Sequence, residues 1–223
     1  MSSGDTLFDR FLFRLSRRVI RWGLQLKYHF HVEGEENVPA DGPFLLASNH
    51  CSYLDPPICA CAIMSRQIAF MGRDTLLSNP IARWYFPHIG LIPLDRTRGD
   101  LGALRTAIGL LKAGKGVCLF PEGTRSPDGK LQPAKGGIGF LIARGNAPVL
   151  PMHISGSFDA LPKGASKLRP ARISVRIGPV IPPDALLASM TARNDFDSVG
   201  RLVMSRIAAL VPALPPPPQQ LPP

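Results

Sequence analysis

The chain has 223 residues and 45% of them are hydrophobic, which suits one domain with a sizeable core and excludes a disordered protein. Lys and Arg number 26 against 16 Asp and Glu, so the formal net charge is +10. This positive charge favours an anionic partner, which could be nucleic acid, an acidic membrane surface or a phosphorylated substrate.

The first predicted element is an amphipathic helix over residues 6–26. Its apolar residues recur at steps of three and four, which places them on one face, and its arginines fall mostly on the other. Such a helix suits the membrane interface, where each cation near an anionic leaflet contributes about 1 kcal/mol. Packing against its own domain is the alternative, and the two roles can coexist. The apolar face comprises Phe8, Phe11, Leu12, Leu15, Val19 and Trp22, and the basic face comprises Arg10, Arg14, Arg17, Arg18 and Arg21.

Strand and helix signals alternate after this helix. FLLASN (44–49) is a short apolar run that predicts a buried strand. Asp55 before Pro56 and Pro57 predicts a helix start, with the aspartate at the N-cap and the helix running to about residue 64. The alternation predicts an α/β fold with a mixed, largely parallel sheet flanked by helices. Further strands are predicted at 67–72, 90–94, 116–120, 149–154 and 172–178, and further helices at 74–86 (capped by Asp74), 100–113, 135–144 and 196–211.

The apolar runs and the cysteine pattern predict where the protein resides. No run approaches the roughly 20 apolar residues that cross a bilayer, and the N-terminus lacks the apolar core and cleavage site of a signal peptide. The cysteines fit no zinc or thioredoxin spacing, so we expect reduced, buried thiols in a cytosolic protein. A peripheral protein on the cytoplasmic face of the membrane is therefore expected. The cysteines are Cys51, Cys59, Cys61 and Cys118.

Three polar segments follow predicted strands at their carboxyl ends, which is the default ligand position in α/β sheets. NHCSYLD (49–55) holds a histidine and, five residues later, an aspartate, the commonest orienting partner of a catalytic histidine. FPEGTRS (120–126) combines a glycine, two hydroxyls and an arginine that can bind an oxyanion through two N–H groups. GLIPLDR (90–96) leaves an arginine beyond another strand. Taken singly, each segment also reads as an ordinary polar loop.

In combination, these segments resemble the signatures of the glycerolipid acyltransferases, the family of 1-acyl-glycerol-3-phosphate (lysophosphatidate) acyltransferases. NHCSYLD resembles the HxxxxD signature and FPEGTRS resembles the substrate-binding signature. GLIPLDR and VLPMHI (149–154) resemble the second and fourth blocks of the family. The four segments come in the family's order within about residues 31–157.

The resemblance implies a role for each matching residue. His50 would be the general base that takes the proton from a glycerol hydroxyl, and Asp55 would hold its imidazole in the right tautomer. The hydroxyl would then attack the thioester of an acyl-CoA or an acyl carrier protein, with no bound cofactor, no metal and no acyl-enzyme. The other blocks would bind the substrate, through Arg96, Glu122, Gly123, Thr124, Arg125, Ser126 and Pro151.

The chain divides into three predicted regions. Residues 1–30 hold the basic amphipathic helix, residues 31–211 form the acyltransferase domain, and residues 212–223 form a disordered proline-rich tail. Many relatives carry longer N-terminal hydrophobic segments, so this shorter basic helix favours peripheral attachment. The expected partners are an anionic membrane surface, a lysophospholipid and the acyl donor.

We therefore predict an O-acyltransferase of phospholipid biosynthesis that converts lysophosphatidate to phosphatidate. The four blocks do not define the head-group pocket, so glycerol 3-phosphate, another lysophospholipid or a lyso-aminolipid stays open as the acceptor. A hydrolase would need a nucleophile elbow, GxSxG, which the sequence lacks. A non-catalytic anionic-lipid-binding protein would leave His50 and Asp55 without a role. No nucleic-acid-binding motif is present, so nucleic acid is not an expected partner.

Overall fold

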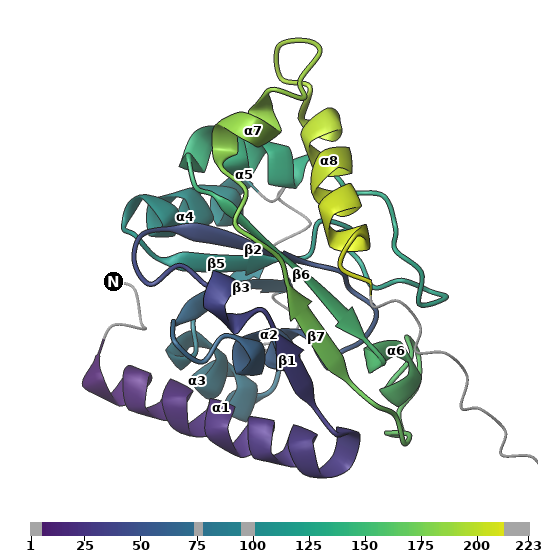
Figure 1. Cartoon of the computed structure of the whole chain (residues 1–223). Coiled ribbons are helices and arrows are strands. Elements are labelled where there is room, and N and C mark those ends of the chain that lie inside the picture. Colours follow the sequence, from purple (N-terminus) through teal and green to yellow (C-terminus); the bar gives the residue numbers. More distant parts are fainter. Residues whose placement is uncertain (1–5, 74–77, 95–100, 212–223) are drawn as a thin grey trace, which may run out of the picture.

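One sheet runs through the molecule and helices cover both of its faces (Figure 1). The computed structural model describes residues 6–73, 78–94 and 101–211. The strands are β1 (His31–Glu33), β2 (Phe44–Ser48), β3 (Ile68–Arg73), β4 (Leu91–Leu94), β5 (Gly116–Leu119), β6 (Val149–Ser155) and β7 (Ser174–Ile177). Their order across the sheet is β1-β7-β6-β2-β5-β3-β4. Among the pairings of these described strands, only that of β6 with β7 is antiparallel, which confirms the predicted mixed, largely parallel sheet.

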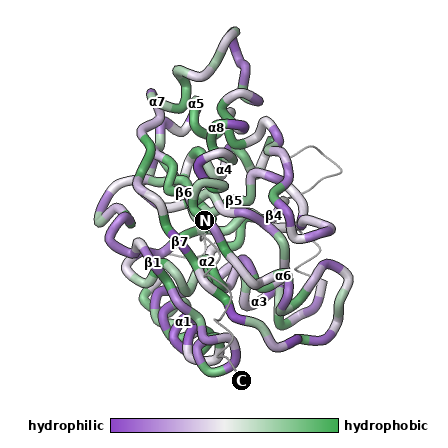
Figure 2. Tube along the Cα trace, turned by 45° about the vertical axis from the view of Figure 1, so that its right-hand side comes forward, coloured by the Kyte–Doolittle hydropathy of each residue, from purple (hydrophilic) through white to green (hydrophobic). Residues whose placement is uncertain are grey.

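The helices form a layer on each face of the sheet (Figure 1). α1 (Leu7–Tyr28), α2 (Asp55–Ala62) and α3 (Pro80–His88) lie on one side, and α4 (Leu101–Lys112), α5 (Gly137–Gly145), α7 (Pro183–Leu187) and α8 (Phe196–Ala208) lie on the other. The short elements η1 (Glu35–Asn37) and α6 (Ser157–Ala160) join strands. Figure 2 shows hydrophobic segments along the inner strands and hydrophilic segments in the outer loops.

Strand β2 shows how the sequence fills two cores at once. Phe44 and Leu46 belong to the core shared with α1 and α2, whereas Leu45 and Ala47 belong to the core shared with α4, α5 and α8. Successive side chains of a strand point to opposite faces, so a strand covered on both faces reads as an unbroken apolar run. This is why FLLASN occurs in the sequence without polar alternation.

The predicted elements are present, and apart from α3 their ends agree with the prediction to within three residues. The predicted start of α3 after Asp74 was wrong, because the helix begins at Pro80 and Asn79 caps it by accepting a hydrogen bond from the N–H of Ala82 at 2.7 Å. Asp74 itself lies outside the described residues. The elements β1, η1, α6 and α7 were not predicted, because they are too short to show a periodic pattern.

Helix α1 packs one side against α2 and exposes the other. It begins with a capping box formed by Thr6 and Asp9. Phe13, Leu24 and Tyr28 are buried in the core. No helix within the described ranges has the length and apolarity needed to span a bilayer. The outward side, which we call the exposed stripe of α1, comprises Phe8, Phe11, Leu15, Val19, Trp22 and Leu26.

Two arginines of the predicted basic face point inward instead. Arg17 is buried and donates hydrogen bonds to the carbonyls of Ile63 and Arg66 at 2.5 and 2.8 Å. Arg21 donates to the carbonyl of Cys61 at 2.8 Å. Carbonyls at the end of a helix have no partner within the helix, and these guanidinium groups satisfy the end of α2 and the turn after it. Arg17 and Arg21 thus lie opposite the apolar residues, as the periodicity predicts, but they hold α2 and do not belong to a membrane-facing surface.

Candidate active site

The two main signature segments meet because their strands are neighbours in the sheet. β2 and β5 pair in parallel, with Ala47 opposite Leu119. The carboxyl ends of both strands therefore lie on the same side of the sheet, and NHCSYLD (49–55) comes to lie beside FPEGTRS (120–126). This is the arrangement expected for polar segments at the carboxyl ends of parallel strands.

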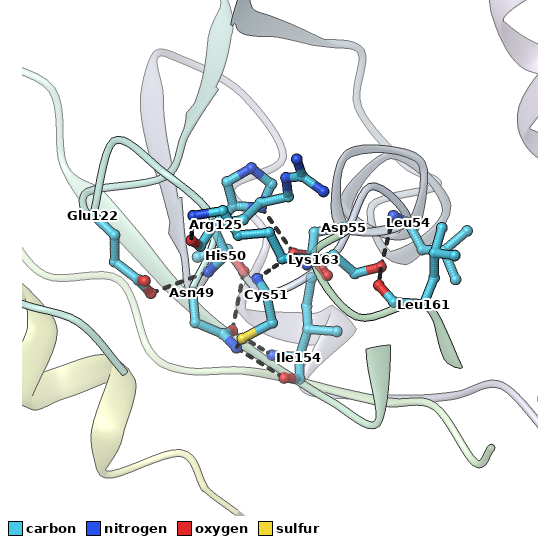
Figure 3. Close-up of polar contacts among 12 residues, drawn as sticks. Asn49, His50, Cys51, Leu54, Asp55, Glu122, Arg125, Ile154, Leu161 and Lys163 are labelled. Carbon is cyan, nitrogen blue, oxygen red and sulfur yellow. Dashed lines mark hydrogen bonds and ion pairs between the residues drawn. The ribbon is translucent and has the colours of Figure 1, made fainter. Parts of the chain in front are cut away.

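His50 and Asp55 form a hydrogen-bonded pair (Figure 3). The distance between His50 Nδ1 and Asp55 Oδ2 is 2.8 Å. The Asp55 side chain is fully buried, while the His50 side chain keeps 17% of its surface exposed, so the histidine can meet a substrate. A carboxylate can only accept, so Nδ1 carries the hydrogen and Nε2 holds the lone pair that can take a proton.

The Asp55 carboxylate also organises the loop between the two residues. Its Oδ2 accepts the backbone N–H groups of Cys51 at 2.6 Å and Ser52 at 2.7 Å. Asp55 is the first residue of α2 and not its N-cap, contrary to the prediction, because its side chain turns back to this loop. Pro56 and Pro57 follow in the first turn, where the missing N–H groups leave no helical hydrogen bond unmade.

The FPEGTRS segment holds His50 by its backbone and by its ring. The N–H of His50 donates to Glu122 Oε1 at 3.1 Å, and the carbonyl of His50 accepts from the N–H of Ser126 at 2.7 Å. The Phe120 ring stacks on the imidazole with centroids 4.0 Å apart and planes 16° apart. Glu122 and Ser126 are buried, so the Glu122 carboxyl and the Ser126 backbone N–H support the His50 loop from inside the protein.

The environment of Glu122 favours its protonated form. Burial raises the pKa of Glu122 to about 7, although the N–H groups of His50 and Gln132 oppose the rise. Its Oε2 is buried and has no hydrogen-bond partner in the ranges that the structure describes. The folded protein therefore holds a proton on this carboxyl at a pH where the unfolded chain releases it.

We expect Glu122 to make the stability of the protein depend on pH. A raised folded-state pKa contributes stability that is complete below the ordinary glutamate pKa of 4.5 and is lost as the pH rises through about 7. Wild type should lose on the order of 1–3 kcal/mol of unfolding free energy over this window relative to Glu122→Gln, which keeps the acceptor for His50. Urea denaturation at several pH values measures the difference. Glu36→Gln, at an exposed position, is the matched control, and parallel profiles of wild type and Glu122→Gln would refute the expectation.

Arg125 lies near His50 (Figure 3) and is held on two sides. Its carbonyl accepts from Lys163 Nζ at 3.3 Å, and its guanidinium carbon lies 3.4 Å from the centre of the Tyr53 ring. Its Nη1 is buried and has no hydrogen-bond partner among the described residues. A buried charged donor without an acceptor is costly, so this group is suited to an anionic ligand.

The other predicted binding residues lie in different parts of the structure. Gly123 has a φ of +65°, in the left-handed region that favours glycine, and its neighbour Thr124 is partly exposed. Pro151 is buried within β6, inside the sheet. Arg96 lies outside the described residues. The structure thus brings His50, Asp55 and the FPEGTRS segment together, while Pro151 lies within the adjoining strand, opposite Ala47 of β2.

Two polar residues of the first signature have contacts that the sequence analysis did not identify. The Asn49 side chain donates to the carbonyl of Ile154 at 2.9 Å and accepts from its N–H at 2.7 Å (Figure 3), which prolongs the pairing of β2 with β6. Ser52 Oγ donates to the carbonyl of Leu161 at 2.9 Å. These partners lie more than 100 residues later in the chain, so only adjacency to His50 hinted at a role.

The cysteine next to His50 is poorly suited to act as a nucleophile. All four cysteines are buried and unpaired, as predicted. Burial, helped by the charges of Asp55 and Glu122, raises the pKa of the Cys51 thiol to about 12. The thiolate is the nucleophilic form, and it is scarce near neutral pH at such a pKa.

Comparisons with known proteins agree with the signatures. A family model described as Acyltransferase matches residues 29–155. The chloroplastic 1-acyl-sn-glycerol-3-phosphate acyltransferase BAT2 of Brassica napus is 32% identical over 166 residues, which are 71% of this chain and 48% of that protein. The 1-acyl-sn-glycerol-3-phosphate acyltransferase of Bacillus subtilis is 29% identical over 160 residues, which are 70% of this chain and 79% of that protein.

A solved structure extends the similarity to the fold. The crystal structure of the 1-acyl-sn-glycerophosphate (LPA) acyltransferase PlsC from Thermotoga maritima matches with a TM-score of 0.72 and 28% identity. The match covers 91% of this chain and 79% of that chain. The chain spans half or less of the first plant relatives, 48% of BAT2 and 39% of LPAT1 of Arabidopsis thaliana.

Proposed function

Because the chain belongs to the acyltransferase family, we propose that it transfers a fatty acyl group from an acyl thioester to the free glycerol hydroxyl of lysophosphatidate, yielding phosphatidate. The names of its relatives support this acceptor. The single observation that carries the proposal is the His50–Asp55 pair beside Arg125. It combines a general base with a cation whose Nη1 donor has no partner among the described residues, as a phosphorylated alcohol requires.

His50 is the general base in this proposal. Its Nε2 removes the proton from the acceptor hydroxyl as the oxygen attacks the thioester carbonyl, and the buried Asp55 carboxylate stabilises the imidazolium that forms. The tetrahedral intermediate then collapses, the thiolate leaves, and the imidazolium returns the proton to the sulfur. A thioester is already activated, so direct transfer needs no acyl-enzyme and no bound cofactor, and the protonated thiol of Cys51 takes no part.

Arg125 binds the acceptor phosphate, and this fixes the hydroxyl near His50. Holding the two reactants in one geometry is a large part of the rate gain in such reactions. Gly123 and Thr124 lie on the same loop and contribute backbone and hydroxyl groups to the acceptor site. Glu122 and Ser126 act indirectly, by fixing the backbone of His50.

A panel of acceptors and donors tests the function. Purified protein is incubated with lysophosphatidate, glycerol 3-phosphate, lysophosphatidylethanolamine or a lyso-aminolipid, each with an acyl-CoA or an acyl carrier protein thioester. Mass spectrometry reads the product. We expect phosphatidate from lysophosphatidate as the dominant product. Efficient acylation of another acceptor instead would support the acyl-transfer reaction but show that lysophosphatidate is not the substrate. Thioester hydrolysis without acyl transfer would overturn the proposal.

The exposed stripe of α1 supports peripheral attachment to an anionic membrane. Aromatic and aliphatic side chains face outward along the whole helix, and Arg14 and Arg18 are exposed beside them. These arginines line a surface depression together with Leu7, Phe11 and Leu15. Apolar burial and attraction to anionic lipid combine in such a helix. The neighbouring helix α3 also carries exposed apolar residues, Ile81 and Trp84.

Replacing Arg14 and Arg18 with glutamine should weaken binding to anionic vesicles by roughly tenfold or more, since each cation near the surface contributes about 1 kcal/mol. Binding of wild type should also fall as salt shortens the Debye length from about 10 Å at 0.1 M to about 3 Å at 1 M. Co-sedimentation with phosphatidylglycerol vesicles measures both effects. Arg17 and Arg21 stay unchanged because they hold α2.

The matched control removes the same charge elsewhere. Arg201→Gln with Arg206→Gln alters two exposed arginines of α8, on the opposite side of the sheet. This control should sediment with vesicles nearly as well as wild type. An equal loss in both double variants would assign the effect to net charge alone and not to α1.

A further inference from the structure

Tyr53 and Arg125 bring the two signature loops into direct contact. The guanidinium carbon of Arg125 lies 3.4 Å from the centre of the Tyr53 ring. At this distance the guanidinium must lie over the face of the ring, in van der Waals contact, because an approach from the edge would keep the centres farther apart. A guanidinium standing upright at this height would push its nitrogens into the ring, so its plane lies close to parallel with the ring, as in a cation–π stack.

A flat stack leaves the hydrogen-bonding capacity of the arginine intact. The five N–H donors of a guanidinium lie in its plane and point to its edges, so a ring on one face covers none of them. This agrees with the unpaired state of Arg125 Nη1 among the described residues. Tyr53 therefore holds the Arg125 guanidinium in place and leaves its N–H donors available to an anion.

The loop that carries Tyr53 is held by hydrogen bonds. The residue before Tyr53 is Ser52, whose N–H donates to Asp55 and whose Oγ accepts from the N–H of Leu54 at 3.1 Å. On the other side of the stack, the backbone of Arg125 is held by Lys163. Because both backbones are fixed, the orientation of the Arg125 guanidinium depends on the ring that its face contacts.

We propose that Tyr53 is a positioning residue that orients Arg125 for the phosphate of the acceptor, a phosphomonoester. This rests on the proposed function, in which Arg125 binds that phosphate. A free arginine side chain loses rotamer freedom when it grips an anion, whereas a stacked one has lost that freedom during folding. Only the face of the Tyr53 ring is needed, and its hydroxyl is dispensable. Tyr53 has 58% of its surface exposed, so replacing it should leave the fold intact.

Steady-state kinetics of Tyr53→Leu tests the proposal. We expect the acceptor KM to rise about five- to thirty-fold, which corresponds to about 1–2 kcal/mol at 1.4 kcal/mol for each factor of ten. The kcat and the donor KM should stay within about twofold. Tyr53→Phe keeps the ring and should restore the low acceptor KM. Phe140→Leu is the matched control, because it removes the ring beneath Arg144 on α5 and should leave the acceptor KM unchanged.

A double-mutant cycle separates this inference from the proposed function. In an Arg125→Ala background, Tyr53→Leu should add nothing to the acceptor KM, and with a monoacylglycerol acceptor, which lacks the phosphate, it should have no effect in either background. If Tyr53→Leu costs the same with and without Arg125, Tyr53 contacts the acceptor directly and the positioning role is wrong. If Arg125→Ala leaves the acceptor KM unchanged, the phosphate site of the proposed function fails first.

Discussion

Replacing His50 with alanine should lower kcat for acyl transfer by about 10²–10⁴-fold, because the variant lacks the group that takes the proton from the acceptor hydroxyl. The melting temperature should change little. The imidazole lies at the rim of the site, and the His50 loop is held through its backbone by Asp55, Glu122 and Ser126. Thioester consumption at saturating lysophosphatidate, together with a thermal melt followed by circular dichroism, measures both quantities.

Asp55 provides the contrast, because its carboxylate serves the loop as well as the imidazole. Asp55→Ala should lose activity over the same range and also lose about 2–4 kcal/mol of stability, since it leaves the buried N–H groups of Cys51 and Ser52 without their acceptor. Comparing the two variants thus separates the loss of catalytic activity from the loss of stability. A His50→Ala protein that turned over within a few-fold of wild type would contradict the general-base role.

Arg125→Ala should raise the KM for lysophosphatidate by about 10–100-fold, because a hydrogen bond to a charged group contributes about 1.5–3 kcal/mol. The donor KM should move much less, since Arg125 is assigned to the acceptor phosphate. Arg125→Lys should recover part of the affinity, because lysine keeps the charge but lacks the planar fork. Initial rates over a matrix of acceptor and donor concentrations resolve the two KM values.

Arg144→Ala is the control for this prediction. It removes an exposed arginine from α5 with the same change in net charge, and it should leave both KM values near those of wild type. A selective rise in the donor KM of Arg125→Ala would reassign the guanidinium to the phosphates of the acyl donor. The acceptor site would then have to be sought on other cations near His50.

Several features of the site follow from local sequence alone. The carboxyl-terminal ends of β2 and β5 carry NHCSYLD and FPEGTRS, and strands of buried apolar residues followed by polar loops are visible without tertiary information. Pairing of these strands in parallel then places His50 beside Glu122 and Arg125. The His50–Asp55 distance is set by five residues of one loop, so the pair could be predicted from the sequence.

The direction of each side chain was harder to predict. Helical periodicity placed Arg17 and Arg21 opposite the apolar stripe, and that placement on the helix surface was right. Periodicity cannot say which side meets the protein. In the structure the side with Arg17 and Arg21 faces α2, and the stripe with Phe11 and Trp22 faces outward.

By itself, the sequence determined the α/β fold class, the strands and helices long enough to show a period, and the loops that carry the chemistry. These depend on residues a few positions apart, whose spacing dictates the local backbone. Only the tertiary structure decided that Glu122 is buried against the backbone of His50, that Arg17 satisfies carbonyls 46 or more residues away, and that Tyr53 supports Arg125. Each of these contacts joins segments far apart in the chain, and burial and hydrogen bonding across such distances arise only when the sheet and its helices pack together.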